Sequence, residues 1–270
     1  MLSPRQKLSL FVNSLGTFLI SFFGVKITII LVKYILALSF GIETRLVGFR
    51  LMGISPAESG VWNFESVYAF YSAELVVSFL VFLGAFISFR MKFDQPPLRR
   101  AFYLWLGFSA IHSFCAGIIS GVITKTNVFH FFHWLYIPYH ILMLMAISLL
   151  PFMVLFGWFY NQQFLIATPI NKADSKLKDQ KMVLIYSMFL PLMAGALILM
   201  IPIIFTFHRY EFYEMAALFV LAVPVLFYFY RLPYYKHTQD FSKIIKYKRL
   251  ILGLTGCAIF LAINLLRYFW

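Results

Sequence analysis

Charged side chains are scarce in this sequence of 270 residues. Asp, Glu, Lys and Arg together make up only 12% of the chain, and 10 residues in all are acidic. A water-soluble domain of ordinary composition has about 25% charged residues, and it needs them to cover its surface. The scarcity therefore excludes an ordinary water-soluble domain.

Cysteines are equally few. The chain has 2 of them, Cys115 and Cys257, and each lies in an apolar segment without a CxxC neighbour. This excludes a disulfide framework and a cysteine-rich zinc site. Both residues are predicted to be small packing side chains.

Common catalytic motifs are also missing. The chain contains no Walker A loop, no HExxH, no GxSxG and no GxGxxG. These absences exclude the most recognisable ATPases, zinc peptidases, α/β hydrolases and dinucleotide-binding enzymes. No cofactor is predicted.

Apolar and aromatic residues are abundant instead. They account for 62% and 20% of the chain, and the mean hydropathy is +0.84. The apolar residues form continuous runs of about 20, the length that crosses a membrane as a helix, and they do not alternate as in a strand. We therefore expect an all-α, polytopic transmembrane helical bundle that forms a single membrane-embedded domain over 1–270. The seven expected spans are 9–32, 66–89, 101–123, 134–160, 182–206, 213–230 and 250–269.

The first apolar stretch runs from about residue 8 to 40 and is longer than the apolar region of a signal peptide. We expect it to be retained, either as one tilted helix or as a span followed by an interfacial helix that ends near Gly41. The loop that follows, 41–65, contains Gly53, Pro56 and Gly60 and should form turns with one short helix.

The basic residues predict the orientation. Most of the 23 lysines and arginines lie before the first span or after the second, fourth and sixth spans. By the positive-inside rule these segments are cytoplasmic, which places the N-terminus in the cytoplasm and the C-terminus on the opposite side. The net charge of +13 is thus explained by topology, and no nucleic-acid partner is expected. The absence of an Asn-x-Ser/Thr sequon is consistent with the cytoplasmic (inner) membrane of a prokaryote.

Ionisable residues at membrane depth are candidates for function, because burying them is costly. Glu74 lies well inside the second expected span. Lys26 is its expected partner, with Lys33 on the same helix face as the alternative. Glu74 then forms a structural ion pair or hydrogen bond, or it serves as a substrate or proton site. The lysines alternatively extend their charged ends to the outer interface.

Histidines provide a second group of candidates. His112 and His140 are expected at similar depth in the third and fourth spans. A weaker pattern suggests a metal site, because two histidines one turn apart near the outer surface can share an ion with ligands from another helix. The simpler alternative is that the interfacial histidines are solvated and that the deeper ones hydrogen-bond within the bundle. The weak metal candidates are His130, His133, His208, Glu211 and Glu214.

Three functions remain open at this point. Short loops and the lack of a catalytic motif favour a non-enzymatic subunit or scaffold of a membrane protein complex, with the lipid bilayer and other membrane proteins as partners. The first alternative is a membrane-embedded enzyme that uses an outer-leaflet Glu/His site on a lipid-like or peptide substrate. The second is a proton-coupled transporter in which Glu74 titrates.

Overall fold

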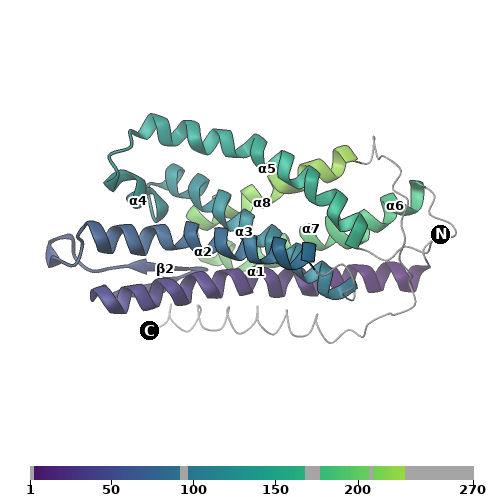
Figure 1. Ribbon diagram of the computed structural model, residues 1–270, viewed down its shortest axis with the longest axis horizontal. Coiled ribbons are helices and arrows are strands. Elements are labelled where there is room, and N and C mark those ends of the chain that lie inside the picture. The colour runs from purple at the N-terminus through teal and green to yellow at the C-terminus, as the bar shows by residue number, and fades with distance from the viewer. Residues whose placement is uncertain (1–2, 92–96, 168–176, 207–208, 229–270) are drawn as a thin grey trace.

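The computed structural model describes residues 3–91, 97–167, 177–206 and 209–228 (Figure 1). Over these residues the chain is almost entirely helical, and 5 helices are long and apolar enough to cross a membrane. Their length and composition are compatible with a membrane protein. The helices are α1 Pro4–Phe40, α2 Phe64–Met91, α3 Pro97–Thr124, α4 Val128–Trp134, α5 Tyr139–Ala167, α6 Leu177–Leu184, α7 Leu190–Thr206 and α8 Arg209–Tyr228.

The first apolar stretch is one continuous helix of 37 residues. Of the two forms expected for it, the structure has the single long helix. Ser3 caps the start of α1, with its side chain accepting a hydrogen bond from the Gln6 N–H and the Gln6 side chain accepting one from the Ser3 N–H. Gly41 ends the helix in the left-handed conformation, with φ of 69°.

The fourth expected span begins later than its apolar sequence suggested. The apolar run from residue 134 is interrupted, because α4 ends at Trp134 and α5 starts at Tyr139, directly after Pro138. Tyr136 lies between them with φ of 55°, which a helix cannot accommodate. The sixth expected span corresponds to α8, whereas the seventh, 250–269, lies outside the described residues. The count of seven spans and the orientation remain predictions.

The loop after α1 contains a β-hairpin that the sequence did not predict. Strand β1, Thr44–Val47, pairs antiparallel with β2, Arg50–Gly53, and the expected short helix follows as a 3₁₀ turn, η1, at Ala57–Ser59. Gly48 is the first of the two residues that join the strands and has φ of 56°. Glycine at this position is typical of a two-residue hairpin turn, because other residues rarely adopt a positive φ.

The long helices lie side by side along the length of the molecule, and α1 runs from one end to the other (Figure 1). The hairpin and α4 lie at one end, and the start of α1 and α6 lie at the opposite end. Helix α3 is central, since it packs against α1, α2, α5 and α8. It is also the most buried of the five long apolar helices: 83% of the residues in its most apolar stretch are buried, against 22% for α5.

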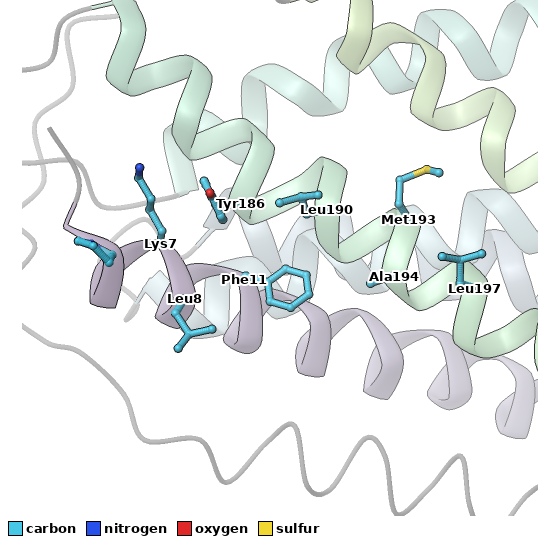
Figure 2. A pocket seen from close by; sticks show the side chains of 9 residues that line it. Lys7, Leu8, Phe11, Tyr186, Leu190, Met193, Ala194 and Leu197 are labelled. Carbon is cyan, nitrogen blue, oxygen red and sulfur yellow. The ribbon is translucent and has the colours of Figure 1, made fainter.

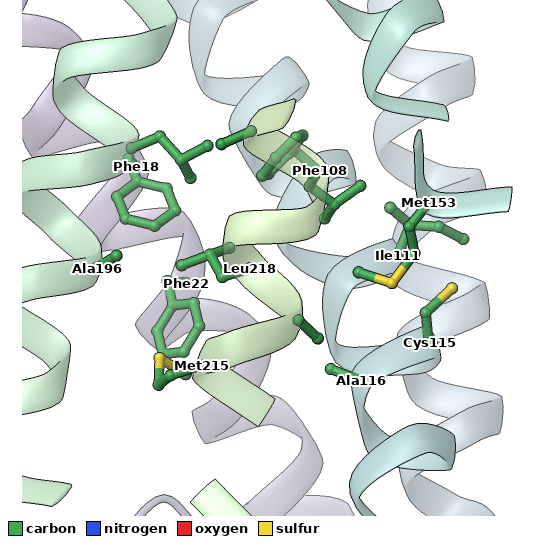
Figure 3. Close-up of a cluster of buried hydrophobic side chains, with 14 of the residues drawn as sticks. Phe18, Phe22, Phe108, Ile111, Cys115, Ala116, Met153, Ala196, Met215 and Leu218 are labelled. Carbon is green, nitrogen blue, oxygen red and sulfur yellow. The ribbon is translucent and has the colours of Figure 1, made fainter. Parts of the chain in front are cut away.

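Aromatic side chains fill the core toward the end of the bundle where the chain begins. Trp105 of α3 lies 4.8 Å from the Phe18 ring and 4.7 Å from the Phe164 ring, measured between centroids. Figure 3 shows the apolar core continuing between α1, α3, α5, α7 and α8, with Cys115 among its buried side chains. Cys115 is a free, buried thiol, as its apolar setting predicted. Cys257 lies outside the described residues.

Between α6 and α7 the helix widens into a π-helical segment, η2, at Ile185–Phe189. Pro191 follows, and proline lacks the N–H that would bond the Ser187 carbonyl in a regular α-helix. The Ser14 hydroxyl of α1 donates a hydrogen bond to that carbonyl instead, and it accepts one from Trp105 Nε1 at 2.8 Å. The irregular segment is thereby fixed to α1 and α3.

Candidate functional site

Polar and charged side chains gather in the half of the bundle nearer the hairpin, apart from the aromatic core. Helix α1 supplies two lysines, α2 a glutamate, α3 a histidine, and α8 a tyrosine and two glutamates. The hairpin adds an arginine and the turn after α3 an asparagine. We call this set the buried polar network. It consists of Lys26, Lys33, Arg50, Glu74, His112, Asn127, Tyr210, Glu211 and Glu214.

Helix periodicity explains how a few helices supply so many members. Lys26 and Lys33 lie two turns apart on one face of α1. On α8, Tyr210 and Glu211 lie within one turn of Glu214 and face the same side. Each of these side chains is at least nine-tenths buried, so none of the charges reaches the surface.

An ion pair joins the first and last described helices. The Lys26 ammonium forms a salt bridge and hydrogen bond with the Glu214 carboxylate, and both side chains are buried. His112 Nε2 lies 3.0 Å from the backbone carbonyl oxygen of Glu214. A carbonyl oxygen can only accept, so Nε2 carries the proton and the imidazole donates this bond. Glu214 therefore links α8 to α1 through its carboxylate and to α3 through its backbone carbonyl.

Glu74 is held by an amide and a phenol. The Asn127 side-chain amide donates to its carboxylate, and the Tyr210 hydroxyl lies 3.4 Å from Glu74 Oε1. Asn127 Oδ1 in turn accepts a hydrogen bond of 2.7 Å from Lys33 Nζ. Asn127 therefore bridges the lysine and the carboxylate. Lys33 also lies 4.5 Å from the centroid of the Phe70 ring, which is within cation–π range.

Glu211 ties the hairpin to the bundle. The Phe49 N–H donates to Glu211 Oε1 at 2.9 Å. The backbone approaches so closely here that a Cβ on Gly48 would overlap the Glu211 carboxylate. Arg50, next along the hairpin, lies 4.2 Å above the Tyr210 ring and donates to Thr126 Oγ1 at 3.3 Å.

The charges of the network are balanced. The network contains three cationic side chains, Lys26, Lys33 and Arg50, and three carboxylates, each of which has a hydrogen-bond donor. Isolated charges are very costly in an apolar interior, whereas paired and hydrogen-bonded ones are tolerated. Chemically, the arrangement can hold and share protons along its hydrogen bonds and can clamp helices together.

The structure brings several predicted residues together with a different pairing. Glu74, Lys26 and His112 all belong to the network, but the carboxylate that salt-bridges Lys26 is Glu214. Lys33, the alternative partner, reaches Glu74 through Asn127. The two lysines are buried and do not extend to the interface. His140 does not join them, because it is exposed near the start of α5.

The metal candidates are dispersed. Within the described ranges, no three His, Cys, Asp or Glu residues are grouped so that they could hold a metal ion. His130 packs against the Tyr71 ring at 5.1 Å, and His133 stacks on Phe129 at 5.6 Å. Glu211 and Glu214 are engaged in the network as described, and His208 lies outside the described residues. Burial lowers the pKa of His130, and positive charge on His133 and Lys33 acts in the same direction.

Three members of the network were missed by sequence reasoning. Asn127 and Tyr210 are neutral residues at helix ends, and Arg50 lies in the loop 41–65, for which the sequence predicted only turns and one short helix. The sequence does hold one signal, because Glu211 and Glu214 follow Tyr210 on one face of α8 and make two of the few carboxylates in the chain. In the structure these two carboxylates contact Lys26 and the backbone of the hairpin.

A comparison of this chain with protein-family models, curated proteins and solved structures found no match.

Proposed function

We propose that this chain is a non-enzymatic membrane protein that serves as a rigid subunit or scaffold for other membrane proteins. The observation that carries the proposal is that the buried polar network contains equal numbers of cationic and carboxylate side chains, three of each, with Lys26 and Glu214 paired directly and the others held by hydrogen bonds and ring contacts within the network. Two surface grooves lie within the described part of the chain, one along Lys7 and Leu197 and one beside His133, and neither is lined by a residue of the network. The network thus has the features of a set of contacts that hold the helices and the hairpin in place.

The buried polar network connects parts of the chain that are distant in sequence. It ties α1 to α8, α2 to the turn before α4, and the hairpin to α8. Buried ion pairs add little net stability, but one partner without the other is strongly unfavourable, so such pairs favour a single arrangement of helices. A fixed arrangement is what a scaffold requires, and the inner membrane of a prokaryote remains the proposed location.

Helix α5 is the proposed partner face, because it is the least buried of the five long apolar helices in the described part of the chain. Leu144 and Leu155 are 65% and 70% exposed on it. A photo-crosslinking amino acid at either position in native membranes should yield a crosslink to one defined membrane protein. The matched control is the same group at Leu80 of α2, which is 60% exposed and should react with lipid alone. Crosslinks to lipid alone from all three sites would contradict the scaffold.

A transport assay distinguishes the scaffold from the alternative function, a proton-coupled transporter. The purified chain, reconstituted in liposomes with an imposed pH gradient, should carry no proton flux above that of protein-free liposomes. Glu74→Gln keeps a hydrogen-bond acceptor for Asn127 and should leave the α5 crosslink in place. A proton flux that Glu74→Gln abolishes would replace the scaffold with a carrier.

A further inference from the structure

A groove of about 640 Å³ lies between the start of α1 and the segment formed by η2 and α7. This volume falls in the range of roughly 300–1,000 Å³ that is usual for small-molecule sites. Figure 2 shows the lining side chains arranged along the two helices, with Lys7 and Tyr186 at one end and Leu197 at the other. The lining residues are Pro4, Lys7, Leu8, Phe11, Tyr186, Leu190, Met193, Ala194 and Leu197.

One end of the groove is cationic and polar, and the remainder is apolar. Lys7 Nζ lies 5.8 Å from the centroid of the Tyr186 ring, so an ammonium and a phenol share the mouth. Among the described residues none of those that line the groove is acidic, and the first turn of α1 contains no acidic residue either. Arg5, exposed beside the mouth in sequence, adds a second positive charge. The polar end thus selects for an anion, and the rest selects for a hydrocarbon chain.

The shape of the groove follows from how α1 and α7 converge. A Cβ on Gly195 would overlap the Phe18 ring, so the helices touch closely at this level. Toward the start of α1 they are separated by the larger side chains of Phe11, Tyr186 and Leu190. The hydrogen bond from Ser14 to the Ser187 carbonyl fixes the π-helical segment that presents Tyr186. Such segments are frequent at functional sites.

We propose that this groove binds an anionic phospholipid, with the phosphate at Lys7 and the Tyr186 hydroxyl and one acyl chain along Phe11 and Ala194 toward Leu197. A lysine and a tyrosine near the end of a membrane helix lie at the depth of lipid headgroups. A partner helix would also fill the apolar part, but it would leave Lys7 without an anion unless it carried a carboxylate at that level. A phospholipid brings the phosphate and the chain together.

Native mass spectrometry of the full chain in detergent tests the proposal. Phosphatidylglycerol and phosphatidylcholine with identical acyl chains are added in turn, and bound lipid is counted per protein. Phosphatidylglycerol should bind in a single tight site, and Lys7→Gln should weaken it about fivefold, the effect expected for one basic side chain near an anionic headgroup. Ala194→Phe should abolish the tight site by filling the groove.

Arg90→Gln is the matched control, because Arg90 is an exposed basic residue at the end of α2 and does not line the groove. It should leave lipid binding unchanged. Equal binding of the two lipids, or equal losses in Lys7→Gln and Arg90→Gln, would overturn the proposal. Displacement of the lipid by inorganic phosphate alone would also overturn it, since the acyl chain would then contribute nothing. Ala194→Phe protein that retains the tight site would show that the lipid binds elsewhere.

Discussion

Individual residues of the buried polar network depend on partners far along the chain. Lys26 and Glu214 are separated by 188 positions, yet each neutralises the other in the interior. Removing one partner leaves a buried charge without compensation, whereas removing both leaves an apolar contact. The interaction energy of the two side chains is therefore measured only when the two single variants are compared with the double variant.

The first prediction concerns this pair. Lys26→Met and Glu214→Leu should each lower the free energy of unfolding by about 3–5 kcal/mol. The double variant should lose much less than the sum, because no charge is left unpaired. Unfolding in mixed detergent micelles measures all three, with exposed Arg45→Met as a control that should change stability by less than about 0.5 kcal/mol. Strictly additive losses would show that the two side chains do not interact.

Among the elements, the hairpin depends most on a single position. Its turn is attached to α8 where the backbone at Gly48 and Phe49 comes close enough for Glu211 to accept a hydrogen bond. A side chain at Gly48 meets two obstacles, the positive φ and the Glu211 carboxylate. The position of the hairpin thus depends both on the absence of a side chain at Gly48 and on the Glu211 carboxylate.

The second prediction follows from this docking. Gly48→Ala should lower the free energy of unfolding by about 1–3 kcal/mol through backbone strain alone. Displacement of the Glu211 carboxylate by the new methyl group should lower it further. Gly24→Ala is the matched control, since Gly24 lies within α1 with no neighbour near its missing Cβ. That change should be neutral or stabilise by up to about 1 kcal/mol. Equal stability of the two variants, measured by thermal unfolding in detergent, would mean that Glu211 does not hold the hairpin.

Sequence reasoning succeeded where the signal was local. The length of the apolar runs predicted the long helices, and Gly41 marked the end of α1 correctly. It failed at the hairpin, because eight strand residues in a polar loop lack the extended alternation that predicts a sheet. For the site, the cost of burying an ionisable side chain identified Glu74, Lys26 and His112 as candidates. Which side chains they contact, however, depends on how the helices pack. Lys26 could not be assigned to Glu214 before the neighbours of α1 were known.

For the whole molecule, the distribution of basic residues makes a prediction about sidedness. Arg45→Cys in the hairpin should react with a membrane-impermeant maleimide in intact cells, whereas Lys178→Cys in α6, after the fourth expected span, should react only after permeabilisation. A tag at residue 270 should lie on the side of the hairpin if there are seven spans. Labelling of both cysteines from the same side would contradict the proposed topology.

The salt bridge between α1 and α8 also has a consequence for synthesis. A ribosome makes the first helix long before the eighth, so the Lys26 ammonium of α1 enters the translocation machinery while its partner, Glu214 of α8, is still untranslated. Helix α1 is therefore expected to remain beside the insertion channel or a membrane chaperone until α8 emerges. Chains truncated before residue 209 should then be degraded faster than the complete protein.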